Sequence, residues 1–539
     1  MMAFAQPLPD AGRVQRDNEP RALPAPRPQV PLDMPKPPIA DSVSGGATVQ
    51  IASVRFSGNT LLTSEVLQAS VSDLIAKPVD LSGLKAVADR VTSQYLAAGY
   101  PFARGYLLPQ EITDGVLQVG VIEGRYGRIN VVGDERLAPL SAPFLAALQP
   151  GDPIASAPLE RRLLILADQP GVNVSALIRS GAAEGEGDLQ ITVSHTARFR
   201  IDVGVDNHGS QYTGKDRLRI DAELDSPFRL GDQLVIRGIV SEQDLWLGSL
   251  GYGLPIGVSG LRAAGSFSRT TYELGEPFAA LGASGTADVA AIDLSYPLIR
   301  SPMMNLGLSA SVQRKMLRDQ LRVIDSNERK SSWSIPSTVR FDCRSDSGGL
   351  TYGALSVTVG RLHLQGDALN IDQASGRSAD GLFRKWNLDL ARVQPFGQSR
   401  VSAFLRVSAQ RADRNLDSSE KFSLGGPAAV RAYPTGEGNG DEGMYGQLEL
   451  RVAAGPVSPF VFFDAGSTRI NARTSNLSAA SLANGRSISG VGVGTRLNRG
   501  GWEAEAVAAW AVDGGAPEAE VSTGSPRVWL TAHYRFEVR

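Results

Sequence analysis

The sequence predicts a transmembrane β-barrel of about 16 antiparallel strands, preceded by an N-terminal helix, a Pro-rich linker and two small α+β domains. Three observations support this prediction. Helical periodicity stops near Phe199, and the remaining 341 residues alternate apolar and polar side chains between Gly, Asn, Asp and Pro. Residues 47–198 pass twice through the order of strand, helical region and closing strand. Residues 6–45 contain ten of the 32 prolines.

The composition argues against several classes of protein. Charged residues make up 20% of the chain and apolar residues 42%, and no aliphatic run approaches the roughly 20 residues of a membrane-spanning helix. Alternating strands are the other way to cross a bilayer. The single cysteine, Cys343, and four scattered histidines predict neither an internal disulfide nor a metal site, and we expect no cofactor. A net charge of −2 without a basic stripe argues against nucleic acid as a partner.

The N-terminal segment has three parts. We interpret residues 1–5 as the remnant of a removed signal peptide, the alternative being an added start at the cleavage point. Residues 6–22 include LPDAGRVQRDNE, which fits about two helical turns able to lodge against a surface, although a disordered tail is equally compatible with the composition. Residues 23–46 are a Pro-rich linker, expected to be extended and to join neither a helix nor a sheet, because most of its amides are absent or constrained.

Two small domains are predicted at residues 47–127 and 128–198. In the first, an alternating strand from Val49 ends at the Gly58–Asn59 turn, a helix ends at Gly99, and two strands follow at 103–108 and 116–122. The second has a strand from Arg128, a helix near 158–166 and the closing strand DLQITVSH. Neither contains a nucleophile, base and acid at plausible positions. Both are therefore interpreted as binding modules whose sheet edges accept extended chains.

Residues 199–539 are predicted to form the barrel. Sixteen strands would leave about 21 residues for each strand and its loop, and roughly 12 to 18 strands also fit this length. We expect the last strand to pair with the first, because lipid offers no water to unpaired edge amides. A soluble β-sandwich is the alternative. In the final segment, RVWLTAHYRFEVR, we expect an apolar face of Val528, Leu530, Ala532, Tyr534, Phe536 and Val538, opposite Arg527, Thr531, His533, Arg535 and Glu537.

Two glycine-containing segments need separate interpretation. GSQYTGKD, at 209–216, nearly fits the phosphate-binding loop GxxxxGK[ST], but Asp216 stands where a hydroxyl would hold magnesium. The following RLRIDAEL predicts a strand instead of the helix whose N-terminus would face the phosphates, so we expect no nucleotide. The glycines of GVGVG near Gly490 lie within a strand pattern, where glycine marks bending or close backbone approach.

A Gly-rich loop that begins at Phe422 is the most informative part of the sequence. Pro427 and Pro434 bracket its Arg431, so the loop can hold one conformation. If it folds into the barrel, this arginine needs a carboxylate, since a partly desolvated charge without a partner is costly. Asp464 of FVFFDAG is the candidate, in a bidentate pair that Lys could not reproduce. In an alternating strand, Phe460, Phe462 and Asp464 share a face, which conflicts with a simple lipid-outward rule; the sequence leaves that face open.

Taken together, these residues resemble the haemolysin activation and secretion family, the TpsB transporters of two-partner secretion. RFSGNTLL and ARGYLLPQEITDGVLQVGVIEGR are similar to the first polypeptide-transport-associated (POTRA) domain of the family. LGGPAAVRAY with GDEG and FFDAG resembles its diagnostic loop and partner strand. The resemblance implies two periplasmic POTRA domains, a 16-stranded outer-membrane barrel, and a helix within 6–22 that can plug the pore.

The resemblance also implies a functional site. A loop at about 425–443 would fold inward, and its arginine would contact the Asp of an F-x-D-x-G strand. Ala432 stands where many members have Gly, which reduces backbone freedom at the loop tip. No catalytic residue is implied, and we do not expect an enzyme. The implied motif and anchor residues are Val430, Arg431, Ala432, Tyr433, Asp464 and Gly466.

The implied function is translocation of a large secreted TpsA-type exoprotein, an adhesin, haemolysin or contact-dependent toxin, with activation of that partner as a further option. The POTRA domains would recognise the unfolded partner, and the barrel, set in outer-membrane lipid, would be the conduit and would use no ATP. The main alternative is a barrel-assembly and insertion factor of the same superfamily, which usually has more periplasmic units. An outer-membrane lipase or protease would need a nucleophile and base, and passive porins lack periplasmic repeats.

Overall fold

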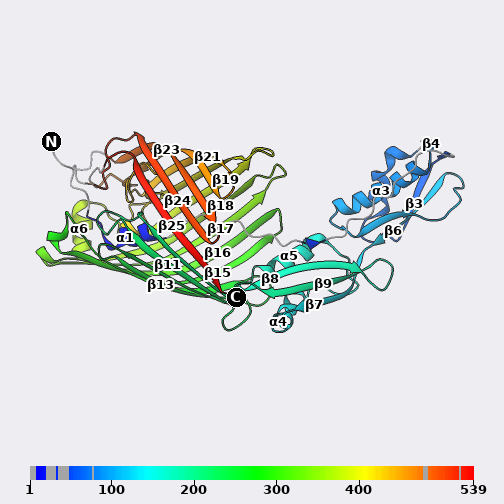
Figure 1. Ribbon diagram of the computed structural model, residues 1–539, viewed down its shortest axis with the longest axis horizontal. Coiled ribbons are helices and arrows are strands. Elements are labelled where there is room, and N and C mark those ends of the chain that lie inside the picture. The colour runs from blue at the N-terminus through cyan, green and yellow to red at the C-terminus, as the bar shows by residue number, and fades with distance from the viewer. Residues whose placement is uncertain are drawn as a thin grey trace. The chain divides into compact units, whose positions relative to one another are not determined.

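The computed structural model describes residues 8–19, 32–33, 48–75, 78–477, 484–520 and 524–538. The chain divides into two compact units, each described separately below (Figure 1). One unit contains the N-terminal helix and residues 197–539 except the turn 300–302, and the other contains residues 29–196 and that turn. Within the described residues, none of the helices combines the length and the apolar character needed to cross a membrane.

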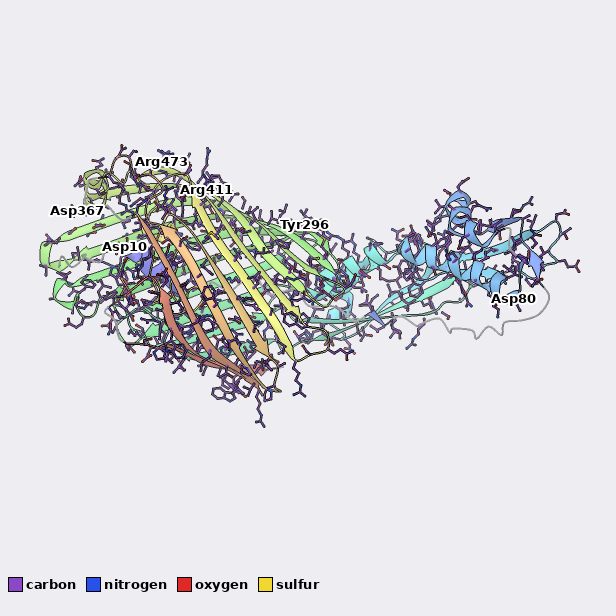
Figure 2. The ribbon with its side chains drawn as sticks, turned by 90° about the horizontal axis from the view of Figure 1, so that it is seen from above. Asp10, Asp80, Tyr296, Asp367, Arg411 and Arg473 are labelled. Atoms are coloured by element: carbon purple, nitrogen blue, oxygen red, sulfur yellow. The ribbon has the colours of Figure 1, made fainter. Side chains whose placement is uncertain are left out.

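The first small domain packs two helices on a three-stranded sheet of order β3-β6-β5, with β3 parallel to β6 and β5 antiparallel to it. Asp80, labelled in Figure 2, caps the longer helix by accepting from the Gly83 amide, and Gly99 follows that helix with φ +89°. The predicted helix and the two strands after it are confirmed. The elements are β2 (Val49–Gln50), β3 (Ser53–Ser57), α2 (Ser64–Ser70), β4 (Pro78–Val79), α3 (Leu81–Ala97), β5 (Ala103–Leu107) and β6 (Val116–Glu123).

The predicted single strand from Val49 is wrong, because the structure has two short strands, β2 and β3. The chain leaves the strand conformation between them, where the Ala52 amide donates to the carbonyl of Gly115. Ile51 is fully buried there, in the core between sheet and helices. The alternation of side chains continued through this break, so the pattern by itself did not reveal it.

The second small domain has a sheet of order β1-β8-β9-β7. Its predicted strand begins at Arg125, three residues before the expected Arg128, and α4 and β8 were not predicted. The apolar side chains of α5 line the core, and Leu159, Leu163 and Leu166 are almost completely buried. The elements are β7 (Arg125–Gly133), α4 (Leu137–Leu145), α5 (Ser156–Ala167), β8 (Val172–Ser180) and β9 (Glu186–His195).

The linker enters this sheet, which corrects the expectation that it joins no sheet. Leu32 and Asp33 form β1 (Leu32–Asp33) and pair in parallel with Ala176 and Leu177 of β8. Neither of the two is a proline, so both keep the backbone N–H that a ladder requires. The rest of the predicted linker lies outside the described residues.

The unit that contains most of residues 197–539 is a closed barrel of 16 strands that follow one another in chain order, β10 to β25. The last strand closes on the first, from Phe199 opposite Val538 to Asp206 opposite Thr531, as predicted. β11 begins directly after GSQYTGKD, so a strand and not a helix follows this segment. The strands are β10 (Phe199–Asp206), β11 (Arg217–Asp225), β12 (Gln233–Ser241), β13 (Trp246–Pro255), β14 (Arg262–Glu273), β15 (Ala283–Arg300), β16 (Met304–Leu321), β17 (Ser326–Arg344), β18 (Leu350–Gly366), β19 (Gly381–Pro395), β20 (Val401–Ala412), β21 (Glu442–Val452), β22 (Val457–Arg469), β23 (Gly485–Arg499), β24 (Trp502–Asp513) and β25 (Arg527–Val538).

Alternation along the strands separates an apolar outer surface from a polar lumen. On β25, Leu530 and Phe536 are about half exposed on the outside, while Arg535 binds Asp202 of β10 across the inner wall. Trp529 is an exception: it lies on the lumen side and is 4% exposed. A large aromatic side chain buried in the lumen indicates that another segment packs on the inner wall there.

That inner volume holds the N-terminal helix α1 (Ala11–Asn18), which lies inside the barrel in both views (Figures 1 and 2). Asp10 caps it by accepting from the Arg13 amide at 2.9 Å. Ala11 and Val14 pack with Tyr272 and Leu317 of the barrel wall. Helix formation within the predicted range 6–22 is therefore confirmed for residues 11–18, and residues 1–5 lie outside the described part of the chain.

Candidate functional site

A second segment inside the barrel is the loop between β20 and β21. It narrows to a hairpin-like base where Phe422 and Gly440 exchange two backbone hydrogen bonds of 2.7 and 2.9 Å. Beyond this base a further backbone hydrogen bond closes a turn, in which the Val430 amide donates to the carbonyl of Leu424. Val430 and Tyr433 are fully buried. The predicted inward-folded loop thus lies against the lumen wall, and its central tetrapeptide is shielded from water.

Arg431 is held by Asp464 through three hydrogen bonds. Its Nε and Nη2 donate to the two carboxylate oxygens at 2.8 and 2.7 Å, and its backbone N–H donates to Oδ2 at 3.1 Å. Asp464 has no exposed surface and Arg431 has 3%. The side-chain pair is the bidentate fork expected from the sequence, and the main-chain bond fixes the loop backbone at the same point.

Glu449 of β21, which was not predicted as a site residue, is a second partner of Arg431. Its Oε1 accepts from Nη1 of Arg431 at 2.5 Å, and its other oxygen accepts from Arg451 and Arg496 at 2.7 and 3.1 Å. Glu449 is 2% exposed. Three arginines and two carboxylates therefore form one network, in which Arg431 and both carboxylates are buried and Arg451 and Arg496 are half-buried. The network satisfies buried charges that would be costly alone.

The open question about Phe460, Phe462 and Asp464 is settled by this network. All three are buried on the lumen side of β22, whereas Val461 and Phe463 are 51% and 45% exposed on the outside. The Arg431 guanidinium carbon lies 3.6 Å from the centroid of the Phe462 ring, and Arg496 stacks on Phe460 at 4.2 Å. The aromatic rings face inward because they hold arginines by cation–π contact.

Glycines in β23 make room for these groups. A Cβ atom at Gly490 would lie 2.4 Å from the Cβ of Ala432, and one at Gly492 would lie 2.3 Å from the Phe462 ring. Gly466 has the same role on β22, where a Cβ would meet Leu424 at 2.5 Å. Contacts this short are sterically excluded. The GVGVG segment therefore marks close approach, one of the two readings that its sequence allowed, and the loop fits the wall only where side chains are missing.

The remaining tetrapeptide contacts reach the last two strands. The Tyr433 hydroxyl oxygen lies 2.9 Å from the carbonyl oxygens of both Asp513 and Gly515, which share its one hydrogen. Trp529 donates its indole N–H to the carbonyl of Arg431 at 2.7 Å. Tyr433 was predicted as a motif residue, whereas the bond from Trp529 was not predicted. Its position on the polar face of β25 is the signal that could have revealed it.

Glu437, on the far side of the loop tip, is a further anchor that was not predicted. It is fully buried and accepts from Nε and Nη2 of Arg486 at 3.0 and 2.8 Å. It also accepts from the amides of Glu518 and Ala519, in the loop between β24 and β25, at 2.9 and 2.8 Å. Glu437 lies between two glycines, and no motif in the sequence marks it. Its partners come from segments that are distant in the chain, so the local sequence could not reveal them.

Helix α1 docks on the same loop. Ser418 donates to Asp10 at 2.7 Å, Arg16 donates to the carbonyl of Ser418 at 2.8 Å, and Arg13 reaches the carbonyl of Gly436 at 3.4 Å. A Cβ at Gly12 would lie 2.5 Å from the Ser418 hydroxyl, so the helix backbone touches the loop directly. The helix and the loop therefore occupy the lumen as one connected assembly.

The lumen wall holds this assembly with lysines. Lys330 of β17 binds Asp10 at 2.6 Å, while Lys315 of β16 and Lys385 of β19 each bind Glu420 at 2.8 Å. These ion pairs join the barrel wall to segments that are not part of the barrel ladder. Among the described residues, no group of three or more His, Cys, Asp or Glu is placed to hold a metal ion.

Comparison with known proteins identifies the family. Residues 185–497 match the family described as "Haemolysin secretion/activation protein ShlB/FhaC/HecB". Residues 49–124 match the family described as "POTRA domain, ShlB-type". The chain belongs to this haemolysin secretion/activation family. The resemblance inferred from the sequence is therefore confirmed, and the first small domain is a POTRA domain of the ShlB type.

Relatives of the family agree with this assignment over most of their length. The heme/hemopexin transporter protein HuxB of Haemophilus influenzae is 26% identical, with 93% of this chain and 90% of the relative covered. The outer membrane transporter CdiB of Escherichia coli is 26% identical over 83% of this chain and 75% of the relative. The solved structure of CdiB from Escherichia coli matches with a TM-score of 0.71 at 21% identity, over 94% of both chains, and that of CdiB from Acinetobacter baumannii with 0.66 at 16%.

Membership of the haemolysin secretion/activation family orients the barrel. It is an outer-membrane TpsB-type transporter, and its POTRA domains lie in the periplasm. β10 follows these domains, so it runs outward, and the alternate strands after it also run outward. The loops that follow β10, β16, β20 and β24 are then extracellular in origin. The loop that carries Arg431 therefore starts on the outer side and folds back into the lumen.

Proposed function

We propose that this transporter moves a large, unfolded TpsA-type exoprotein through its barrel lumen, and that helix α1 and the Arg431 loop close the lumen between transport events. The observation that carries the proposal is the way the lumen is filled. Its contents are segments of the chain itself, bound to the wall through side-chain ion pairs such as Lys330 with Asp10. Such contacts can be exchanged for water or for a passing chain without breaking the barrel ladder.

The POTRA domains are proposed to recognise the partner by strand addition. In the first domain β5 is an edge strand, and in the second β7 is an edge strand. Their free N–H and C=O groups can pair with an extended chain. The opposite edge of the second domain, β8, is already paired with β1 of the linker. A partner that used this edge would have to replace residues 32–33.

Arg431 is proposed to fix the loop in its closed position. Its guanidinium meets Asp464 and Glu449 in a buried network, and its neighbour Ala432 fits only against glycine in β23. Val430 and Tyr433 would support this position through burial, and Gly466 through the space that it leaves. Asp464 and Glu449 belong to the barrel wall and would stay in place when the loop moves. They would therefore bind Arg431 in the same orientation each time the loop returns.

The proposed transport needs no nucleotide, cofactor or catalytic step. Folding of the partner outside the cell would bias its movement, and the partner would be an adhesin, a haemolysin or a contact-dependent toxin. Nucleic acid has no place in this proposal. Support comes from the segment 209–216, which forms a loop between two barrel strands and not a strand-to-helix phosphate site.

The test is export in a reconstituted system. The full transporter is placed in liposomes and supplied with an unfolded candidate exoprotein, and the protease-protected fraction is measured without nucleotide. We expect export under these conditions, and a strict ATP requirement would contradict the energetic part of the proposal. A variant without residues 47–198 should still conduct ions but should no longer export. Export by that variant would contradict the role given to the POTRA domains.

A further inference from the structure

Four arginines on three neighbouring strands face outward from the barrel wall. They are Arg314 and Arg318 on β16, Arg329 on β17 and Arg361 on β18, and we call them the outer arginine cluster. Arg318, Arg329 and Arg361 are exposed, and Arg314 is half-buried. They take no part in the loop, the helix or the lumen network described above.

The direction of these side chains follows from the residue after each of them. Lys315 binds Glu420 inside the barrel, Asp319 accepts from the Ala11 amide of the lumen helix, and Lys330 binds Asp10. Successive side chains of a strand point to opposite faces. Because the following residues point inward, Arg314, Arg318 and Arg329 point outward. Arg361 does so as well, since Leu362 after it is buried at 3% exposure.

The cluster lies at the extracellular margin of the apolar surface. β16 is the seventh strand of the barrel and runs outward, so its C-terminal half, with Arg314 and Arg318, is the extracellular half. Earlier on the same outer face of β16 come Leu308 and Val312, which are 43% and 46% exposed. An outward charge is costly at the bilayer midplane and costs little near the interface. The four arginines therefore lie at the level of the outer-leaflet headgroups.

Within the described part of the chain, no acidic side chain neutralises the outer arginine cluster. Arg318 is directly opposite Arg329 in the strand register, and Arg314 and Arg361 both lie opposite Trp333. The outward positions of β16, β17 and β18, which the structure describes in full, contain neither Asp nor Glu, and none of the four arginines forms an ion pair with a described residue. Like charges directly opposite each other on a sheet destabilise it.

Three outward arginines elsewhere on the barrel have acidic partners. Arg269 of β14 forms a bidentate pair with Asp288 of β15, at 2.6 and 2.9 Å. Arg411 and Arg469, at the ends of β20 and β22, lie on either side of Glu442 at 3.9 and 3.4 Å. An acidic side chain of the protein thus neutralises these three arginines, whereas no ion pair is formed within the outer arginine cluster or between it and another described residue.

We infer that the outer arginine cluster binds the phosphate groups of a phosphorylated glycolipid in the outer leaflet, of which lipid A is the simplest form. Guanidinium groups pair with phosphate oxygens in a bidentate manner, and an anion between Arg318 and Arg329 removes their repulsion. Trp333 is 52% exposed, and the Arg314 guanidinium lies 4.8 Å from the centroid of its ring. The acyl chains would rest on the apolar surface that begins with Val312.

Lipid binding to the full-length protein tests this site. The transporter is purified in a zwitterionic detergent and titrated with bis-phosphorylated lipid A, with its phosphate-free derivative and with inorganic phosphate. Bound lipid is counted by native mass spectrometry, and the unfolding midpoint is measured in parallel. The test variant is Arg318→Gln with Arg329→Gln. The control, Arg269→Gln with Arg411→Gln, removes two outward arginines and changes the net charge equally.

We expect lipid A to bind the wild type and the control alike, and to bind the test variant about tenfold more weakly or worse. The phosphate-free lipid and inorganic phosphate should not raise the unfolding midpoint. In lipid-free detergent, Arg329→Gln alone should raise the midpoint, because it removes the repulsion from Arg318. Equal lipid A binding by the test variant, equal binding of the phosphate-free lipid, or an equal effect of inorganic phosphate would each overturn the inference.

Discussion

The guanidinium of Arg431 lies 3.6 Å from the ring centroid of Phe462, two positions before the carboxylate that it binds. The ring and Asp464 thus hold one arginine from two sides. In a strand that faces lipid on one side, an inward phenylalanine is unexpected until this arginine is present. The contact explains why an aromatic residue belongs on the polar face of β22, and it connects the loop to the wall by dispersion as well as by charge.

Replacing Arg431 with alanine should abolish secretion and leave a folded barrel. The change leaves Asp464 and Glu449 with less compensation inside a buried network, and breaking a buried pair in this way costs about 3–5 kcal/mol. The loop would then no longer be anchored to the wall, and an unanchored loop inside the lumen would obstruct the path of the partner. The measurements are the amount of partner protein in the medium and the heat-modifiable migration of the barrel. Arg431→Lys should also fail, because an ammonium cannot make the fork to Asp464.

A matched control for that experiment is Arg451→Ala. Arg451 binds Glu449 but does not contact the loop, and it is 25% exposed on its side chain. Secretion by this variant should stay close to the wild-type level. Normal secretion by Arg431→Ala would refute the role of the loop, whereas equal loss in both variants would attribute the effect to the charge network as a whole.

Gly12→Ala should release helix α1 from the lumen. The added methyl group would lie 2.5 Å from the Ser418 hydroxyl and 2.8 Å from the Ser419 amide. Alanine stabilises a helix by about 1 kcal/mol relative to glycine, so the change weakens docking without weakening the helix. Planar-bilayer recordings should show a larger open fraction. Leu8→Ala, which alters a residue that is 37% exposed just before the helix, should leave the conductance unchanged.

Glu437→Gln should loosen the loop between β24 and β25. The amides of Glu518 and Ala519 donate to this carboxylate, and Gln would offer them a neutral oxygen and lose the ion pair with Arg486. Hydrogen bonds to charged groups contribute about 1.5–3 kcal/mol. Hydrogen exchange of the peptide 516–520 should therefore accelerate by about tenfold or more. The control is Glu442→Gln, because Glu442 pairs with exposed arginines; this variant should not change the exchange rate of the peptide. An unchanged exchange rate in Glu437→Gln would contradict the role of Glu437 as an anchor.

The first POTRA domain should lose stability in acid through Glu123. Burial by itself would raise the pKa of this carboxyl, but hydrogen bonds from the Thr60 hydroxyl, the amides of Leu61 and Thr60, and the Tyr95 hydroxyl lower it below the ordinary value. The folded pKa is thus lower than the unfolded one. The resulting stability is fully present above the unfolded pKa of about 4.3 and is lost as pH falls through the folded pKa.

Hydrogen exchange across residues 48–124 of the full chain, between pH 7 and pH 3, tests this expectation. The wild type should show accelerating exchange in acid, beyond the intrinsic pH dependence of the amides. Glu123→Gln should be destabilised by about 1–3 kcal/mol at neutral pH and should depend less on pH. Glu111→Gln, a change at an exposed carboxylate of the same domain, should behave like the wild type. A wild-type acid response in Glu123→Gln would assign the effect to another group.

The regular parts of the fold were predictable because local patterns specify them. The alternation of apolar and polar side chains predicted the barrel strands, and the need to pair edge amides predicted the closure that joins Phe199 to Val538. Apolar residues at helical spacing predicted α3 and α5. The irregular parts were not. The pairing of Leu32 with Ala176 depends on a partner more than a hundred residues away, and the proline content of the linker pointed in the opposite direction.

For the site, the sequence determined which groups must meet but not how they are held. A lone arginine between two prolines requires a carboxylate, and Asp464 was the candidate with a matching motif. Only the tertiary structure added Glu449 and Trp529, placed Phe462 inward and brought Glu437 to Arg486. Those contacts join loops and strands that are distant in the chain. A sequence pattern records the faces of one strand, whereas the closed barrel decides which faces meet across the lumen.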